Sequence, residues 1–222
     1  MVHFWNHAYQ SRGLPSQKNL PVGLFSESIA AINNYNVYFL SPLDFIHRAN
    51  KLMEGHFQTE DYIKKCGLNY AIFRNVLYMD TIPQFVGEKV FDTGINLPTA
   101  MGRVPFALRS EMGEAIANAL LESGCANRIY KLTGSECYSF DNVAATLTDL
   151  SGKEVDYTPT EKSTFEAQMK ERSVPEIMIE RVTGFLTDIK NGQEEEVSSD
   201  LENLLGRKPT SLREGLKALF NL

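Results

Sequence analysis

The sequence lacks the patterns on which metal sites and disulfide frameworks usually depend. Its three cysteines, Cys66, Cys125 and Cys137, form no Cys-x-x-Cys pair, and its four histidines form no His-Glu-x-x-His motif. We therefore predict no metal site and no disulfide scaffold, and a reducing cytoplasm fits the cysteine content best.

The chain also has little positive charge and no long apolar run. The net charge is −6 and the pI is near 5.3, so we expect no nucleic-acid partner. No run approaches the roughly 20 apolar residues of a membrane span, and the start MVHFWNHAYQSRG has no signal-peptide core. The acidic run 194–196 is predicted to be a solvated face or loop.

What is present is an alternation of strand-like and helix-like segments, which is typical of a parallel α/β sheet. Ser41-Pro42 and Gly67 mark the ends of a strand and a helix. Ser110 and Ser139 are predicted N-caps. We predict strands at 36–41, 68–74, 89–94, 103–108, 128–133 and 153–158, and helices at 26–34, 45–66, 110–124, from 139 onward and through most of 174–220.

The loop that follows the predicted strand 68–74 is the first place to search for a site. In parallel α/β sheets, ligands bind beyond the carboxyl ends of the strands. Residues 75–80 begin at such an end, so the sequence predicts a pocket there.

Four segments together resemble one known family. They are HFQTEDYIKKCGLNYAIFRN, GRVPFALRSEMGEAIANALL, RIYKLTG followed by YSFDNVAATLTDLSGKEVDY, and SSDLENLLGRKPTSLREGL. The chain resembles, over about residues 52–220, the NmrA-like branch of the atypical short-chain dehydrogenase/reductases, of the NAD(P)H:quinone oxidoreductase type. The resemblance implies an α/β fold with a truncated Rossmann-like parallel sheet flanked by helices, and a smaller helix-rich C-terminal lobe.

The family's glycine-rich dinucleotide-binding turn is missing from this sequence. No two glycines lie within two or three residues of each other. We expect an unmatched segment at 1–35, a partial NAD(P)-binding Rossmann-like core at 36–135 and a substrate-side lobe at 136–222. Three explanations stay open: a truncated chain or misassigned reading frame, a degenerate paralogue, or a segment 1–35 that rebuilds the sheet edge.

The resemblance also implies a set of site residues. His56 and Tyr78 are candidate catalytic residues, with His56 as proton donor or carboxamide contact and Tyr78 as a stacking platform. The alternatives are that His56 pairs with Glu60 in its own helix, and that Arg109 is structural, tying a loop to a strand. The expected cofactor contacts are Ser41, His56, Arg74, Asn75 and Val76, and the expected substrate contacts are Tyr78, Phe85 and Phe106, although Phe85 and Phe106 also fit an ordinary core.

The activity that the resemblance implies is hydride transfer from NADPH or NADH to a small quinone-like acceptor, impaired in this chain. None of the nine tyrosines is followed by lysine four residues later, so the usual reductase dyad is absent. The alternatives are a non-catalytic NmrA-like regulator that senses nucleotide or binds a partner, and a degenerate fragment. A homodimer is also possible, because a sheet that lost its first strands would expose unpaired backbone.

Overall fold

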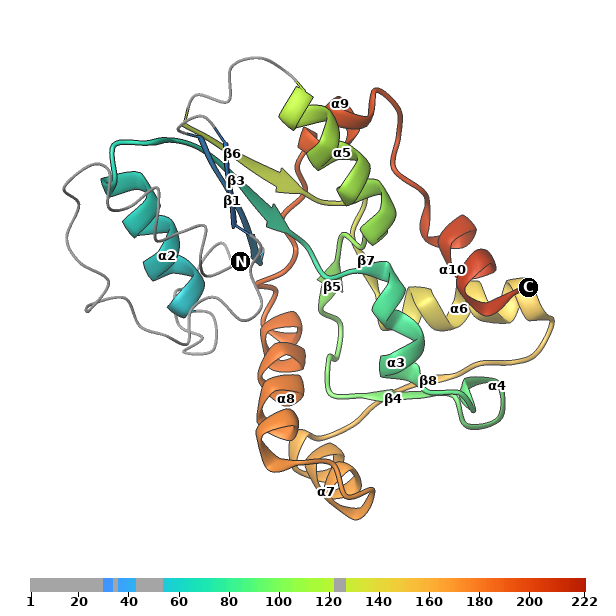
Figure 1. Ribbon diagram of the computed structural model, residues 1–222. Helices are drawn as coiled ribbons and strands as arrows, with labels where there is room; N and C mark the ends of the chain where they lie inside the picture. The colour runs from blue at the N-terminus through green and yellow to red at the C-terminus, as the bar shows by residue number, and fades with distance from the viewer. Residues whose placement is uncertain (1–29, 34–35, 43–53, 122–126) are drawn as a thin grey trace.

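A four-stranded sheet forms the centre of the fold. The computed structural model describes residues 30–33, 36–42, 54–121 and 127–222. The strand order is β1-β2-β3-β6, and β2, β3 and β6 run parallel while β1 pairs antiparallel with β2 (Figure 1). The bounds are Ala30–Asn33 for β1, Asn36–Pro42 for β2, Asn69–Asn75 for β3 and Arg128–Leu132 for β6.

The alternation of side chains along β3 divides the sheet into two faces. Successive side chains of a strand point to opposite faces. Ile72 belongs to a small cluster with Val37, Phe39 and Ile63, of which Ile63 lies on helix α2 (Glu54–Lys65). On the other face, Ala71 and Phe73 join a much larger buried cluster that extends to the C-terminal helices.

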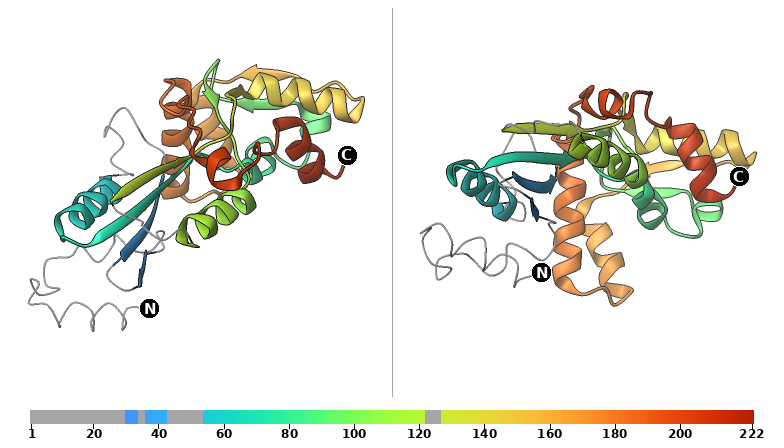
Figure 2. Two further views of the ribbon diagram at one scale, coloured as in Figure 1. Left: turned by 90° about the horizontal axis from the view of Figure 1, so that it is seen from above. Right: turned by 45° about the horizontal axis from the view of Figure 1, so that its top comes forward.

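The large cluster is enclosed by short strands and helices that follow β3. Figures 1 and 2 show these elements on the side of the sheet away from α2. Two-stranded sheets join β4 to β8 in parallel and β5 to β7 antiparallel. The bounds are η2 Met79–Thr81, α3 Ile82–Val86, α4 Val90–Thr93, β4 Ile95–Leu97, β5 Arg103–Val104, α5 Arg109–Leu121, β7 Tyr138–Ser139, α6 Phe140–Ser151, β8 Tyr157–Pro159, α7 Lys162–Glu171, α8 Glu176–Lys190, α9 Asp200–Leu205 and α10 Leu212–Phe220.

The fold confirms the α/β class and most of the predicted elements. Strands β2, β3 and β6 and the C-terminal helices lie where the sequence predicts them. Gly67 has φ +66° after α2, the left-handed conformation expected of a helix stop. Ser139 caps α6, because its hydroxyl accepts from the Asn142 amide while the Asn142 side chain accepts from the Ser139 amide.

Two predicted elements have the wrong type. The predicted helix 26–34 contains strand β1, because residues 30–33 find hydrogen-bonding partners along β2 and this pairing outweighs local propensity. The predicted strand 89–94 contains the one-turn helix α4. That helix stops at Gly94, which has φ +67°, and a Cβ at this position would collide with the Asp156 carbonyl oxygen.

Three smaller predictions are also wrong. Helix α5 starts at Arg109, so Ser110 lies inside it, and the Arg109 amide donates to the carboxylate of the distant Asp80. The predicted strands 103–108 and 153–158 shorten to Arg103–Val104 and Tyr157–Pro159.

The acidic run lies in a loop, as one of the two predicted alternatives has it, but it is not simply solvated. Glu194 is 5% exposed, Glu195 pairs with Arg103, and Glu196 pairs with Lys131. The Lys131 amide also donates to Asp200, and Thr133 exchanges hydrogen bonds with the Ser198 backbone. These contacts fasten residues 194–200 to the end of β6, so the run is structural.

One buried cluster extends across the predicted boundary at 135/136. It joins Phe73 and Leu132 to Phe140, Leu186 and Leu216. The division into a core and a C-terminal lobe therefore stays a prediction. No helix within the described ranges is long and apolar enough to cross a membrane.

Candidate functional site

The candidate site begins at the carboxyl ends of the parallel strands. Pro42 of β2, Asn75 of β3 and Leu132 of β6 lie side by side in register. The Val76 amide donates to the Leu132 carbonyl at 3.1 Å, which carries the chain past the end of β6. The predicted loop thus starts at the edge of the sheet where ligands bind in this class of fold.

Asn75, at this edge of the sheet, has a buried side-chain atom without a hydrogen-bond partner among the described residues. It is 7% exposed, and its Nδ2 donates to the Tyr78 hydroxyl at 3.3 Å. Its Oδ1 is fully buried and has no partner within the described part of the chain. Reversing the amide would only exchange the two atoms, so either orientation leaves one polar atom unpaired. Such an atom costs about 1–3 kcal/mol, and an unpaired buried group in a native structure calls for an explanation.

Tyr78 is held beside Asn75 by backbone contacts. It forms a parallel bridge with Ala107, and the next amide, of Met79, donates to the Ala107 carbonyl at 2.8 Å. The Arg109 guanidinium lies 5.7 Å from the centre of the Tyr78 ring and pairs with Asp80. With Asn75 Nδ2 toward it, the Tyr78 hydroxyl accepts this hydrogen bond, and its own proton is then available for donation.

The Arg74 side chain lies on the face of the sheet opposite to that of Asn75. Its Nε and Nη2 donate to the two carboxylate oxygens of Glu60 at 3.0 and 2.7 Å, and Lys64 also contacts Glu60. Glu60 is 1% exposed, so the pair is a buried tie between α2 and the end of β3. The expected role of Arg74 at the cofactor stays a prediction, while its visible role is structural.

His56 lies on the same face as Arg74. Its ring is half-buried, with its centre 6.3 Å from that of Phe39. Glu60, four residues after His56 in α2, binds Arg74 and so holds the helix against β3. The structure therefore puts His56 near the carboxyl edge of the sheet but on the α2 face, while Asn75 lies on the other face. Its proposed catalytic role stays untested.

The remaining predicted residues are spread over three environments. Ser41 lies opposite Arg74 in the β2–β3 register, and Val76 is buried at 2% exposure. Phe106 is 1% exposed and packs edge-on against Phe140, which places it in the core. Phe85 contacts Phe140 and Phe185 and also faces a cavity.

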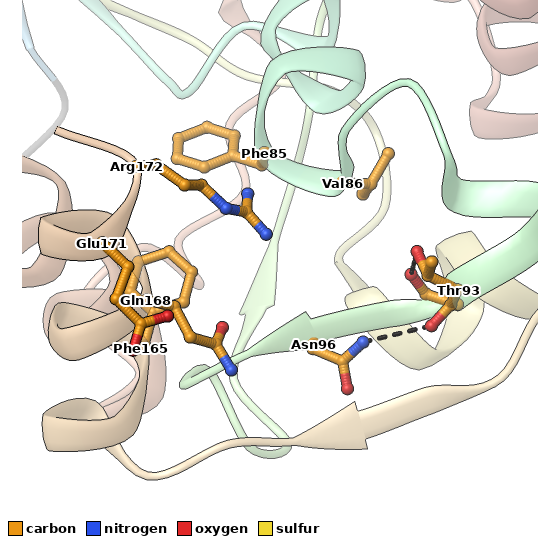
Figure 3. Close-up of a pocket in the computed structure, with 9 residues that line it drawn as sticks. Phe85, Val86, Thr93, Asn96, Phe165, Gln168, Glu171 and Arg172 are labelled. Carbon is orange, nitrogen blue, oxygen red and sulfur yellow. Dashed lines mark hydrogen bonds between the residues drawn. The ribbon is translucent and has the colours of Figure 1, made fainter. Parts of the chain in front are cut away.

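That cavity has a volume of about 440 Å³ and lies between α3, β4 and α7 (Figure 3). Asn75, Val76 and Tyr78 are not in its lining, so it is a second location rather than an extension of the strand edge. The lining consists of Phe85, Val86, Thr93, Gly94, Asn96, Phe165, Gln168, Glu171 and Arg172.

The two cysteines that the structure describes offer no activated thiolate. Burial raises the pKa of Cys66, and burial foremost raises the pKa of Cys137. A raised pKa keeps a thiol protonated at neutral pH, so neither residue is suited to nucleophilic catalysis.

The strand edge has features that fit the nicotinamide end of a dinucleotide. The unpaired atom of Asn75 is suited to an amide or hydroxyl partner, and Tyr78 adds a planar ring with a hydroxyl donor. For the pyrophosphate end, no glycine-rich turn exists in the sequence. The fit therefore rests on one end of such a ligand.

An α/β protein with a Rossmann-like sheet is the class that these features define, and the comparisons agree with it. No family model matches the chain. It is 25% identical over 198 residues to quinone oxidoreductase 2 of Escherichia coli (strain K12), covering 87% of this chain and 69% of the relative. It is 22% identical over 172 residues to an NmrA-like family domain-containing oxidoreductase of Aspergillus flavus, covering 76% and 56%. These homologues confirm that the chain is a relative of the NmrA-like and quinone oxidoreductases.

The solved structures give the same result for the fold. The NADPH-dependent quinone oxidoreductase of Escherichia coli superposes with a TM-score of 0.78 at 24% identity, covering 84% of this chain and 68% of that one. The triphenylmethane reductase of Citrobacter sp. superposes with a TM-score of 0.76 at 26% identity, covering 85% and 66%. Complexes of these two proteins with NADPH and with NADP(H) match as well. The chain thus spans about half to two thirds of the length of its relatives.

Sequence reasoning missed two features of these regions. Glu60 was weighed only as a partner of His56, although the structure pairs it with Arg74 fourteen residues later. A glutamate in the predicted helix before an apolar strand that ends in arginine was the available signal. Arg172 and the α7 residues of the cavity carry no comparable signal, because only the tertiary fold brings α7 to α3.

Proposed function

We propose that the chain is an NAD(P)H-dependent reductase relative that transfers a hydride to a small quinone-like acceptor at the carboxyl edge of β2, β3 and β6. The observation that carries this proposal is the unpaired buried Oδ1 of Asn75 beside the Tyr78 hydroxyl. The relatives that are reductases by name, including one whose structure holds NADPH, support it.

Each residue of the strand edge has a proposed task. The Asn75 side chain would hold the nicotinamide end of the cofactor, with the atom that the protein leaves unpaired as the hydrogen-bonding group. The Tyr78 ring offers a flat surface to a planar acceptor, and its hydroxyl donates to an acceptor oxygen. His56 supplies a proton to the reduced product. Bound NAD(P)H supplies the hydride, so the protein's work is binding, orientation and exclusion of water.

The sequence also supports a proposal for the cell compartment and the partners of the protein. The small number and wide spacing of the cysteines favour the cytoplasm, and the net charge of −6 disfavours nucleic acid. A homodimer remains a proposal for the partner. The sensor function is kept as an alternative that the experiment below distinguishes.

A thermal melt with and without millimolar NADPH or NADH tests the proposal. A ligand at about 100 times its dissociation constant adds about 2.7 kcal/mol of stability, which raises Tm visibly in a domain of this size. We expect a shift with wild type, and turnover when a quinone is added. Asn75→Ala is expected to lose most of the shift, while Asn203→Ala, an exposed asparagine of α9, keeps it.

The outcomes separate the alternatives. A nucleotide-dependent shift without any quinone reduction would favour the sensor. A sharp melt that neither nucleotide moves would contradict nucleotide binding by this chain. An Asn75→Ala variant that binds nucleotide as well as wild type would remove the observation on which the proposal rests.

A further inference from the structure

We propose that the cavity between α3, β4 and α7 binds planar aromatic compounds that carry an anionic group, such as a sulfonate or carboxylate. At about 440 Å³ it falls within the roughly 300–1,000 Å³ of small-molecule pockets. Its walls combine two aromatic rings with one unpaired cation, and this pairing selects the ligand class.

The aromatic walls come from two separate elements. Phe85 of α3 is fixed from behind, because its ring packs edge-on against Phe140 and stacks on Phe185. Phe165 of α7 lines the same cavity and packs against the large cluster. A planar ring between two aromatic side chains gains area burial and favourable ring geometry.

Arg172 is the cation of the cavity. It follows the last residue of α7, and Figure 3 shows its side chain extending toward Phe85 and Val86. Arg74, Arg103, Arg109, Arg207 and Arg213 all pair with carboxylates. Within the described ranges no hydrogen bond or ion pair engages the guanidinium of Arg172, so it is available to a ligand.

A guanidinium of this kind favours a planar, two-oxygen anion. It presents parallel N–H donors that match a carboxylate or sulfonate, and such charge-assisted bonds are roughly twice as strong as neutral ones. The amides of Asn96 and Gln168 lie in the same lining, and Asn96 Nδ2 already donates to the Thr93 carbonyl at 3.2 Å. They offer further polar contacts at the rim.

Glu171 sets the limit on affinity for an anion. Its carboxylate also lines the cavity, and Figure 3 shows it on the Phe165 side, away from the end of the Arg172 side chain. An anion held by Arg172 is repelled by this charge. Removing the charge of Glu171 should therefore strengthen binding, while removing that of Arg172 should weaken it.

The test is a calorimetric titration with anthraquinone-2-sulfonate and its neutral analogue 2-(hydroxymethyl)anthraquinone, in the absence of nucleotide. We expect the sulfonate to bind wild type more tightly than the neutral compound. Arg172→Gln should weaken sulfonate binding about tenfold or more and leave the neutral compound unchanged. Glu171→Gln should tighten sulfonate binding. Lys170→Gln is the matched control, since Lys170 lies in the same helix turn, outside the lining, and pairs with Glu176.

Several results would overturn the proposal, provided that each variant melts as wild type does. These are no sulfonate binding by wild type, equal binding by wild type and Arg172→Gln, or an equal loss in Lys170→Gln. A fourth is displacement of the sulfonate by NADP+ together with weaker NADP+ binding in Arg172→Gln, because the cavity would then belong to the nucleotide.

Whether the bound compound is also an acceptor rests on the reductase function proposed above, and a second readout separates the two. If the protein is a reductase, Arg172→Gln should raise KM for the sulfonate with little change in kcat for the neutral quinone. Failure of turnover with intact sulfonate binding would count against the reductase function alone. Failure of the titration would count against the cavity ligand alone.

Discussion

Among the described residues, the two faces of the central sheet differ in how much buried apolar side chain packs against them. On the α2 face, the described hydrophobic cluster consists of Val37, Phe39, Ile63 and Ile72. The opposite face belongs to a cluster that reaches from β3 to α10. The candidate site draws on both, because Arg74 and His56 lie on the first face and Asn75 and Tyr78 on the second. Among the described residues, one half of the site is therefore supported by far more packed surface than the other.

This difference in packing predicts which side of the site opens first. Local opening is easiest where few apolar contacts are made. We expect the His56–Arg74 side to open before the Asn75–Tyr78 side. Three substitutions test this difference.

Phe140→Ala addresses the large face and has the largest expected effect. Phe140 is 1% exposed and contacts the rings of both Phe85 and Phe106. Its truncation should cost about 3–5 kcal/mol of unfolding free energy. Urea unfolding followed by circular dichroism measures the loss. Phe140→Leu should cost clearly less, and a loss below about 1 kcal/mol for the alanine variant would mean that this face is not the main source of stability.

Glu60→Gln addresses the buried ion pair of the α2 face. It leaves the Arg74 guanidinium, 15% exposed, without its carboxylate. Breaking a buried pair from one side costs about 3–5 kcal/mol, and we expect the lower end because Arg74 retains some solvent. The measurement is the urea midpoint at constant m-value.

A matched pair of controls isolates the charge. The double variant Glu60→Met with Arg74→Met should be much closer to wild type than either single variant, because both buried charges are then removed and Lys64, the other partner of Glu60, is 31% exposed to solvent. Asp149→Asn breaks the exposed pair with Arg213 and should cost at most about 1 kcal/mol. Equal losses at the buried and the exposed pair would contradict the structural role given to Glu60.

The Glu60–Arg74 ion pair is one of the features that local sequence signals could not predict. Continuous apolar runs, proline and glycine stops and the Ser139 cap are local signals, so β2, β3, β6 and α6 could be predicted. Strand β1 could not, because its partner β2 decides its conformation. The loop 75–80 was located from the sheet rule, but the unpaired atom of Asn75 depends on what surrounds it in three dimensions.

Ile72→Val is the smallest change and compares the two faces directly. Ile95→Val is its counterpart, since both isoleucines are 0% exposed and each substitution removes one methylene. Ile72 belongs to the small cluster and Ile95 to the large one. The range for this change is about 0.5–1.5 kcal/mol, and its size depends on how well the surroundings collapse.

We expect Ile72→Val near the lower end of that range and Ile95→Val near the upper end. Among the residues that the structure describes, the small cluster has fewer neighbours to hold a cavity open, whereas the large one is braced by several helices. Urea midpoints at equal m-values measure the difference. A larger loss at Ile72 would reverse the comparison, and it would mean that the α2 face limits the stability of the Arg74 side of the site.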